Sequence, residues 1–152
     1  MYIQRVLLGI CLASAALLAA TPAPVIAAVL NNASGAAAIE SGSWVSIYGS
    51  GLSAVTDSWQ TSEFNGNNLP TTLDGVSVQI DGKPAAIYYV SPGQLNVQAP
   101  TDTATGTVQV QVANSAGTAT GTATLETYSP AFFTFQKPVT QKPVTDETSR
   151  NP

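Results

Sequence analysis

Histidine is absent from the 152-residue sequence, and cysteine occurs only once, as Cys11. The lack of histidine excludes histidine-dependent catalytic triads, histidine general bases and the usual zinc sites. Cys11 lies in a segment that we expect to be removed on export, so the mature chain would have no disulfide and no thiol chemistry. The core must therefore be built from Val, Ile, Leu, Tyr and Trp side chains.

Charge is also scarce. Charged residues make up 9% of the sequence, compared with about a quarter in typical globular proteins. Between Pro24 and Phe135 there are seven acids but only one base, Lys83, which gives a net charge of −6. Such an acidic segment repels phosphate backbones, so we expect no nucleic-acid partner. Thr, Ser, Asn, Gln, Ala and Gly fill the remaining positions, as is common in exported β-proteins.

The N-terminal segment 1–23 has the features of a secretory signal peptide. Arg5 supplies a basic start, Val6 to Ala20 is apolar and uncharged, and small residues follow. The apolar run is shorter than the roughly 20 residues of a membrane-spanning helix, although an uncleaved anchor is the alternative. We expect a secreted or cell-surface protein with no membrane contact after cleavage.

The opposite end of the chain predicts a disordered tail at 136–152. Gln136 to Thr140 reads Gln-Lys-Pro-Val-Thr, and the same five residues recur at once in Gln141 to Thr145. Short proline-containing repeats of this kind are typical of extended linkers. The remaining segment, 24–135, is the predicted folded domain.

The segment from Gly75 to Pro100 carries the strongest strand signals. Val76, Val78 and Ile80 alternate with polar residues, and Asp81-Gly82 favours a two-residue type I′ hairpin turn. We expect a returning strand at 85–90, which is apolar on both faces and so either covered on both sides or twisted across the sandwich. A Ser-Pro-Gly turn then leads to a third strand at 94–98.

Further alternation is found on both sides of this segment. Val45 and Ile47 define one strand, with Gly49 and Gly51 indicating a bulge or a close backbone approach. The segments 107–113 and 118–127 have period-two patterns and are joined by a hairpin loop at 114–117. About seven short strands at roughly ten-residue spacing predict an all-β, immunoglobulin-like antiparallel sandwich.

The segment 53–70 has no periodicity, and long loops of this kind are often functional. It contains two aromatic residues and several asparagines that we consider candidate ligand-binding residues: Trp59, Phe64, Asn65, Asn67 and Asn68. The rings, with Trp44 or Tyr48, could stack on a carbohydrate while the amides hydrogen-bond to it. The alternative is that both rings of the loop fold back and cap one end of the core.

Evidence for catalysis or metal binding is weak. The loop carboxylates, which are the candidates for paired-carboxylate hydrolysis, lie in no recognisable motif: Asp57, Glu63, Asp74 and Asp81. Asp81 is explained by its turn, and Asp74 before Gly75 has the same explanation. Calcium binding by Asp57 and Glu63 lacks a known ligand spacing. We predict no catalytic residues, no metal and no cofactor.

The order of these motifs resembles that of IPT/TIG domains, a branch of the immunoglobulin-like sandwiches. The resemblance extends over about 24–135 and rests on four segments: Gly42–Leu52, Val76–Ala85, Ile87–Pro100 and Gly106–Val112. More narrowly, Leu69–Val78 and Tyr89–Asn96 are similar to an uncharacterised C-terminal module of exported acidobacterial proteins. That module usually continues into a second sandwich half. Here the chain continues instead into the repeats, as a shortened or frameshifted member would.

These observations favour a non-catalytic extracellular interaction or spacer module of an exported bacterial protein. The alternative is a carbohydrate-binding module that uses the loop aromatics. The expected partners are an extracellular protein or a polysaccharide, together with a missing second sandwich half.

Overall fold

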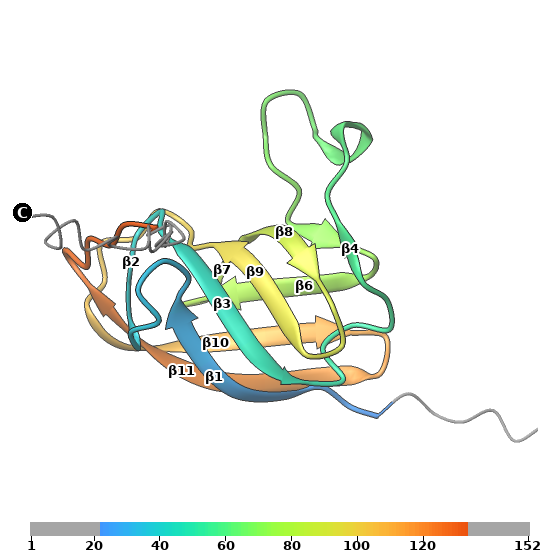
Figure 1. Cartoon of the computed structure of the whole chain (residues 1–152), viewed down its shortest axis with the longest axis horizontal. Coiled ribbons are helices and arrows are strands. Elements are labelled where there is room, and N and C mark those ends of the chain that lie inside the picture. Colours follow the sequence, from blue (N-terminus) through green and yellow to red (C-terminus); the bar gives the residue numbers. More distant parts are fainter. Residues whose placement is uncertain (1–21, 134–152) are drawn as a thin grey trace, which may run out of the picture.

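In the computed structural model, which describes residues 22–133, two β-sheets pack face to face (Figure 1). The first sheet has the order β1 (Val25–Asn31), β3 (Trp44–Ser50), β9 (Gln94–Gln98), β8 (Ala86–Val90) and β4 (Asp57–Ser58). The second has the order β2 (Ala38–Glu40), β11 (Gly117–Glu126), β10 (Gly106–Asn114), β6 (Val76–Ile80) and β5 (Thr72–Leu73), with β7 (Lys83–Pro84) paired to β6. All pairs are antiparallel except β2 with β11.

This arrangement confirms the predicted all-β, immunoglobulin-like sandwich. The helical content of residues 22–133 is one 3-10 turn, η1 (Thr61–Glu63), and no helix in this range could cross a membrane. The predicted signal peptide at 1–23, except its last two residues, and the predicted tail at 136–152 lie outside the described residues.

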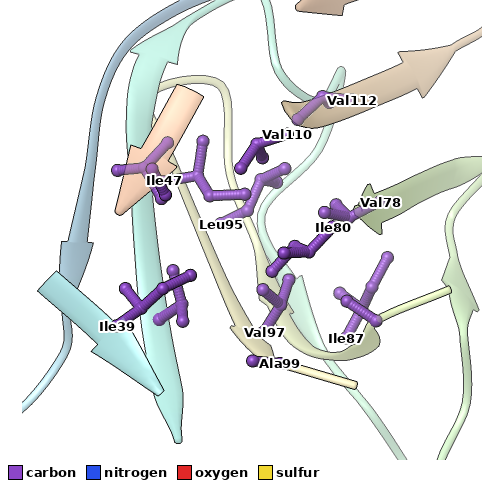
Figure 2. Packing of buried hydrophobic residues seen from close by; sticks show 14 of the residues in the cluster. Ile39, Ile47, Val78, Ile80, Ile87, Leu95, Val97, Ala99, Val110 and Val112 are labelled. Atoms are coloured by element: carbon purple, nitrogen blue, oxygen red, sulfur yellow. The ribbon is translucent and has the colours of Figure 1, made fainter. Parts of the chain in front are cut away.

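The core is the layer between the sheets, and it consists of the apolar residues of the period-two patterns. Figure 2 shows Ile47 and Leu95 of the first sheet beside Val110 and Val112 of the second. The inward residues of the predicted strands are almost completely buried: Val45, Ile47, Val76, Val78, Ile80, Leu95, Val97, Val108, Val110 and Val112. Each removes a branched side chain from water, which stabilises the fold by about 1.5–3 kcal/mol per residue.

The Asp81-Gly82 turn forms as predicted, but the hairpin that it closes is short. Both residues have positive φ, 52° and 71°, as a type I′ turn requires. However, the strand that returns from the turn and pairs with β6 is only the two-residue β7, and the expected partner strand β8 belongs to the opposite sheet. The Ala85 N–H still donates to the Val78 carbonyl at 2.9 Å, but Ala86 already pairs with Gln98 of β9, so the chain crosses between the sheets directly after Ala85.

The apolar pattern on both faces of β8 is explained by a bulge. Of the two predicted alternatives, a strand covered on both faces or one twisted across the sandwich, the first is wrong. Ile87 pairs with Val97, but the next pair along the strand is Tyr89 with Asn96, which leaves Tyr88 without an opposite residue. The extra residue changes the alternation of the strand. Ile87 and Val90 are therefore both buried, while Tyr88 points outward and is 42% exposed.

β1 also has a bulge, between Ile26 and Ala28, and Gly49 of β3 allows β1 to approach closely beside it. A Cβ atom at Gly49 would overlap the carbonyl oxygen of Val25. Across the sandwich, a Cβ atom at Gly121 of β11 would lie 2.9 Å from Cγ2 of Ile26. The close approach predicted from Gly49 and Gly51 is therefore confirmed at Gly49, and β1 packs closely against both β3 and β11.

We predict that Gly49→Ala lowers the free energy of unfolding by about 1–3 kcal/mol, because backbone must move to accommodate the methyl group. Gly93→Ala is the matched control, since the atom nearest to its Cβ would be 3.8 Å away. Urea unfolding followed by circular dichroism measures both variants. Equal stability of the two variants would contradict the close approach of β1 and β3.

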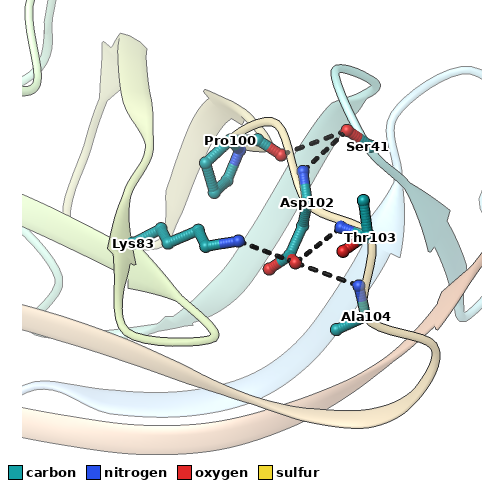
Figure 3. Close-up of polar contacts among 6 residues, drawn as sticks. All are labelled: Ser41, Lys83, Pro100, Asp102, Thr103 and Ala104. Carbon is teal, nitrogen blue, oxygen red and sulfur yellow. Dashed lines mark hydrogen bonds and ion pairs between the residues drawn. The ribbon is translucent and has the colours of Figure 1, made fainter.

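Asp102 fastens the segment that connects β9 to β10 (Figure 3). Its Oδ1 lies 2.7 Å from the Lys83 Nζ and accepts hydrogen bonds from the backbone N–H groups of Thr103 and Ala104. Its own N–H donates to the Ser41 Oγ at 3.0 Å. The ion pair therefore joins β7 to the β9–β10 connection, and the backbone hydrogen bond to Ser41 joins that connection to the β2–β3 turn.

The Asp102 side chain is 5% exposed, whereas that of Lys83 is 46% exposed. The hydrogen bond from Lys83, supported by the backbone N–H groups of Ala104 and Thr103, lowers the pKa of Asp102 from 3.8 to about 2, although burial acts in the opposite direction. Because this pKa is lower in the folded state, the carboxylate stabilises the fold above pH 3.8. This contribution is lost as the pH falls toward about 2.

The Asp102→Asn variant should therefore be less stable than the wild type at neutral pH, and the difference should shrink between pH 3.8 and about 2. Thermal unfolding of both proteins over this range measures the effect. Asp81→Asn removes a carboxylate from an exposed turn and is the control, for which we expect the wild-type acid dependence. If the stability difference between Asp102→Asn and the wild type stayed constant across this pH range, the ion pair would not be the source of that difference.

Candidate functional site

Four aromatic rings from separate segments meet on the outer face of the first sheet. The Trp59 ring lies 5.1 Å from Tyr88, 5.2 Å from Phe64 and 6.0 Å from Trp44, measured between ring centroids. Trp44 is also 5.9 Å from Tyr88. All four contacts are edge-to-face, with interplanar angles of 60–72°. This is a preferred geometry of aromatic pairs, so the rings stabilise one another.

The local fold explains how the rings come together. Trp44 alternates with the buried residue Val45 on β3 and therefore points away from the core. Tyr88 is the unpaired residue of the β8 bulge, and bulges commonly redirect a side chain near functional sites. The backbone N–H of Trp59 donates to the Tyr88 carbonyl at 3.0 Å, which extends the β4–β8 pairing and places the indole over the sheet.

Beside the rings lies a network of amides and one hydroxyl. The Asn96 Oδ1 accepts from the Ser46 Oγ at 3.1 Å, the Gln94 Nε2 at 2.8 Å and the Asn32 Nδ2 at 3.4 Å. Asn32 also donates to the Ser46 Oγ at 2.6 Å. Ser46 and Asn96 are directly opposite one another on β3 and β9, so the sheet register creates the network. Sequence reasoning did not identify these residues as part of a site.

The rings and the amides enclose a cavity of about 250 Å³, lined by Asn32, Trp44, Trp59, Tyr88, Asn96 and Phe133. Concave sites with mainly apolar walls and a few polar groups are typical of ligand-binding pockets, although most exceed about 300 Å³. This volume suits a single ring-sized group. We take this aromatic cavity as the candidate functional site.

The structure brings together only part of the predicted site. Trp59 lines the aromatic cavity, and the Phe64 ring packs against the Trp59 ring. Asn65 and Asn68 instead pair with each other through backbone hydrogen bonds and close a tight turn with Asn67 at its tip. The loop that holds them stands away from the sheets above β4 and β8 (Figure 1). All three asparagines are exposed, and none lines the cavity.

The two rings of the loop do not cap the core. Trp59 and Phe64 are half-buried on the outer face of the first sheet, and neither belongs to the buried cluster between the sheets. They are also not coplanar, since their planes meet at 60°. The rings therefore form the corner of a cavity, and a flat platform of these two residues is absent.

The candidate carboxylates have local backbone roles. Glu63 accepts from the Gln60 N–H at 2.6 Å, and Asp57 accepts from the Ser58 N–H at 2.7 Å. Asp74 and Asp81 occupy turns at positive φ, 48° and 52°. Within residues 22–133, no group of three or more acidic, histidine or cysteine side chains is placed to hold a metal ion.

The segment after β11 lies along the same side of the molecule. The Ser129 N–H donates to the Glu40 carboxylate at 2.6 Å, which holds the segment against β2, and Phe133 reaches the aromatic cavity. Phe133 remains 57% exposed, while Tyr128 and Phe132 are 81% and 84% exposed. The segment is therefore only partly packed against the domain.

We predict that Phe64→Ala loosens the loop 60–69 and leaves the sandwich intact. The substitution removes one edge-to-face contact of Trp59 from outside the core, so the free energy of unfolding should fall by about 1 kcal/mol or less. Amide hydrogen exchange should increase in the loop and stay unchanged in β10 and β11. Val55→Ala, at an exposed loop position outside the ring cluster, is the control. Unchanged exchange in the loop would contradict the anchoring role of Phe64.

Several solved structures from Bacteroides are similar to this chain. They include an auxiliary nutrient binding protein from Bacteroides ovatus (19% identity, TM-score 0.42) and another from Bacteroides thetaiotaomicron (14%, 0.40). A third, provisionally described as a phosphatase, is also from Bacteroides thetaiotaomicron (20%, 0.40). The matches cover 68%, 66% and 74% of this chain but only 21%, 19% and 18% of those chains.

Among curated proteins, a search with this chain finds no match. The model of the family described as IPT/TIG domain, however, matches residues 36–129, which is more than half of the chain. The matched range includes both sheets from β2 to β11, with their strand order and turns as described above. On this evidence the chain belongs to the IPT/TIG domain family, as the order of its sequence motifs suggested.

Proposed function

We propose that the chain is a non-catalytic interaction module that acts outside the cell and uses the aromatic cavity as its contact site. The observation that carries this proposal is the lining of the cavity, which consists of aromatic rings and amides without a carboxylate, lysine or cysteine. Aromatic side chains supply a large contact area at low entropic cost, whereas general acid–base chemistry needs a titrating group near neutral pH.

The extracellular location is part of the proposal. It is supported by the signal-peptide features of residues 1–23 and by the low charge of the chain. The resemblance of Leu69–Val78 and Tyr89–Asn96 to the acidobacterial module adds to the proposal that the protein is bacterial and that a second sandwich half is a partner. Because folds of this class have many roles, the location and the partner need their own tests.

The carbohydrate-binding alternative receives mixed support. Trp59 and Trp44 converge, but the loop asparagines that were expected to assist them lie outside the cavity. A spacer role, which needs no ligand, is the remaining alternative.

Co-sedimentation of the full chain with purified extracellular polymers tests the interaction role. The panel contains insoluble neutral polysaccharides, peptidoglycan and a fibrous protein. We expect the chain to sediment with at least one polymer and to release no soluble fragments from it. Trp59→Ala should reduce the bound fraction about tenfold, because Trp59 contacts each of the other rings.

Tyr128→Ala is the matched control, since Tyr128 is an exposed aromatic residue outside the cavity. Equal binding by Trp59→Ala and the wild type would contradict the proposed site. Release of soluble fragments would contradict the non-catalytic role, and sedimentation with none of the polymers would favour the spacer.

A further inference from the structure

Asn96 presents a fixed hydrogen-bond donor to the aromatic cavity. Its Oδ1 accepts from three groups, those of Ser46, Gln94 and Asn32, while an amide oxygen has only two lone pairs. The oxygen is thus fully used, and this fixes which way the amide points. Among the described residues, the Asn96 Nδ2 has no hydrogen-bond partner, and Asn96 lines the cavity.

Asn32 has the complementary arrangement. Its Nδ2 donates to the Ser46 Oγ at 2.6 Å and, over a longer distance, to the Asn96 Oδ1 at 3.4 Å, so the amide nitrogen faces these two groups. Its Oδ1 is left as an acceptor, and Asn32 also lines the cavity. The cavity therefore has one oriented amide donor and one oriented amide acceptor on neighbouring side chains.

From this pattern we infer that the aromatic cavity binds a neutral pyranose unit, and that Asn96 and Asn32 recognise its hydroxyl groups. This inference rests on the proposed function and names its ligand class. A hydroxyl both donates and accepts, so neighbouring hydroxyls satisfy an amide N–H and an amide C=O together. The C–H face of a sugar ring is apolar and suits the indole walls of Trp44 and Trp59.

Two other ligand classes fit the cavity less well. Strands β3, β9 and β8 pair with one another beneath it, so their backbone groups are not available for a peptide to bind as an added strand. An anionic sugar or a phosphate would find no lysine or arginine among the lining residues. It would also approach a domain with a net charge of −6 between Pro24 and Phe135.

The chain contains its own reporter, because its two tryptophans are Trp44 and Trp59 and both line the cavity. Tryptophan emission of the full chain is followed during titration with neutral cello-, xylo-, manno- and chito-oligosaccharides, with oligogalacturonate and with an aromatic-rich peptide. We expect one neutral series to shift the emission with a dissociation constant on the order of 1 mM or below. Oligogalacturonate should leave the emission unchanged.

Asn96→Asp tests the role of the free donor. The aspartate retains an oxygen for the three existing donors but replaces the Nδ2 donor with an acceptor, and we expect affinity for the sugar to fall at least about tenfold. Asn65→Asp makes the same charge change on the exposed loop, and we expect it to bind like the wild type. In the wild type, a deoxy analogue of the bound sugar should lose affinity similarly, which gives a test independent of variant folding.

The outcomes separate this inference from the proposed function. If only the peptide shifts the emission, and Trp59→Ala abolishes that shift, the sugar inference is wrong while the interaction role stands. If neither sugars nor peptide shift the emission, the sugar inference is also wrong, and co-sedimentation decides the interaction role separately. Equal sugar affinity of Asn96→Asp and the wild type would overturn the assigned role of Asn96.

Discussion

The apolar contact between the two sheets is the interaction on which the rest of the structure depends. The described domain contains no cysteine, and Lys83–Asp102 is the ion pair found within residues 22–133. Neither disulfides nor networks of charged residues therefore contribute to the stability of this domain. Stability must come from strands that bury every second side chain, such as Val110 and Val112 of β10. That requirement fixes the register of each strand, because a slip of one residue would expose the buried set.

The same alternation gives the two outer faces their chemistry. On the second sheet the outward residues of β11 are exposed threonines, Thr118, Thr120, Thr122 and Thr124. On the first sheet the outward positions hold Trp44, Ser46 and Asn96, and the β8 bulge adds Tyr88. Residues of the candidate site therefore lie outside the core, so we expect changes there to affect the proposed binding more than folding.

Much of the fold could be predicted from the sequence, because strands and tight turns are encoded by neighbouring residues. Asp81-Gly82 specifies its turn by the backbone angles that it tolerates, and Val76, Val78 and Ile80 specify a face by their spacing. The site could be predicted only in part, because it depends on pairing between distant segments. Trp44, Trp59 and Tyr88 meet through the register of four paired strands and a one-residue bulge, and no local pattern encodes either feature.

The asparagines of the chain illustrate the difference between a residue that is available and one that is oriented. Asn65, Asn67 and Asn68 are conspicuous in the sequence, but on an exposed turn their amides would have to be ordered by any ligand that they contact. Asn96 is already ordered, because three donors converge on its Oδ1. These hydrogen bonds fix the orientation of the amide and therefore the direction of its N–H groups. Binding at Asn96 therefore avoids an entropic cost that binding at the loop would carry. For this reason we place the proposed ligand site on the sheet face and not at the loop tip.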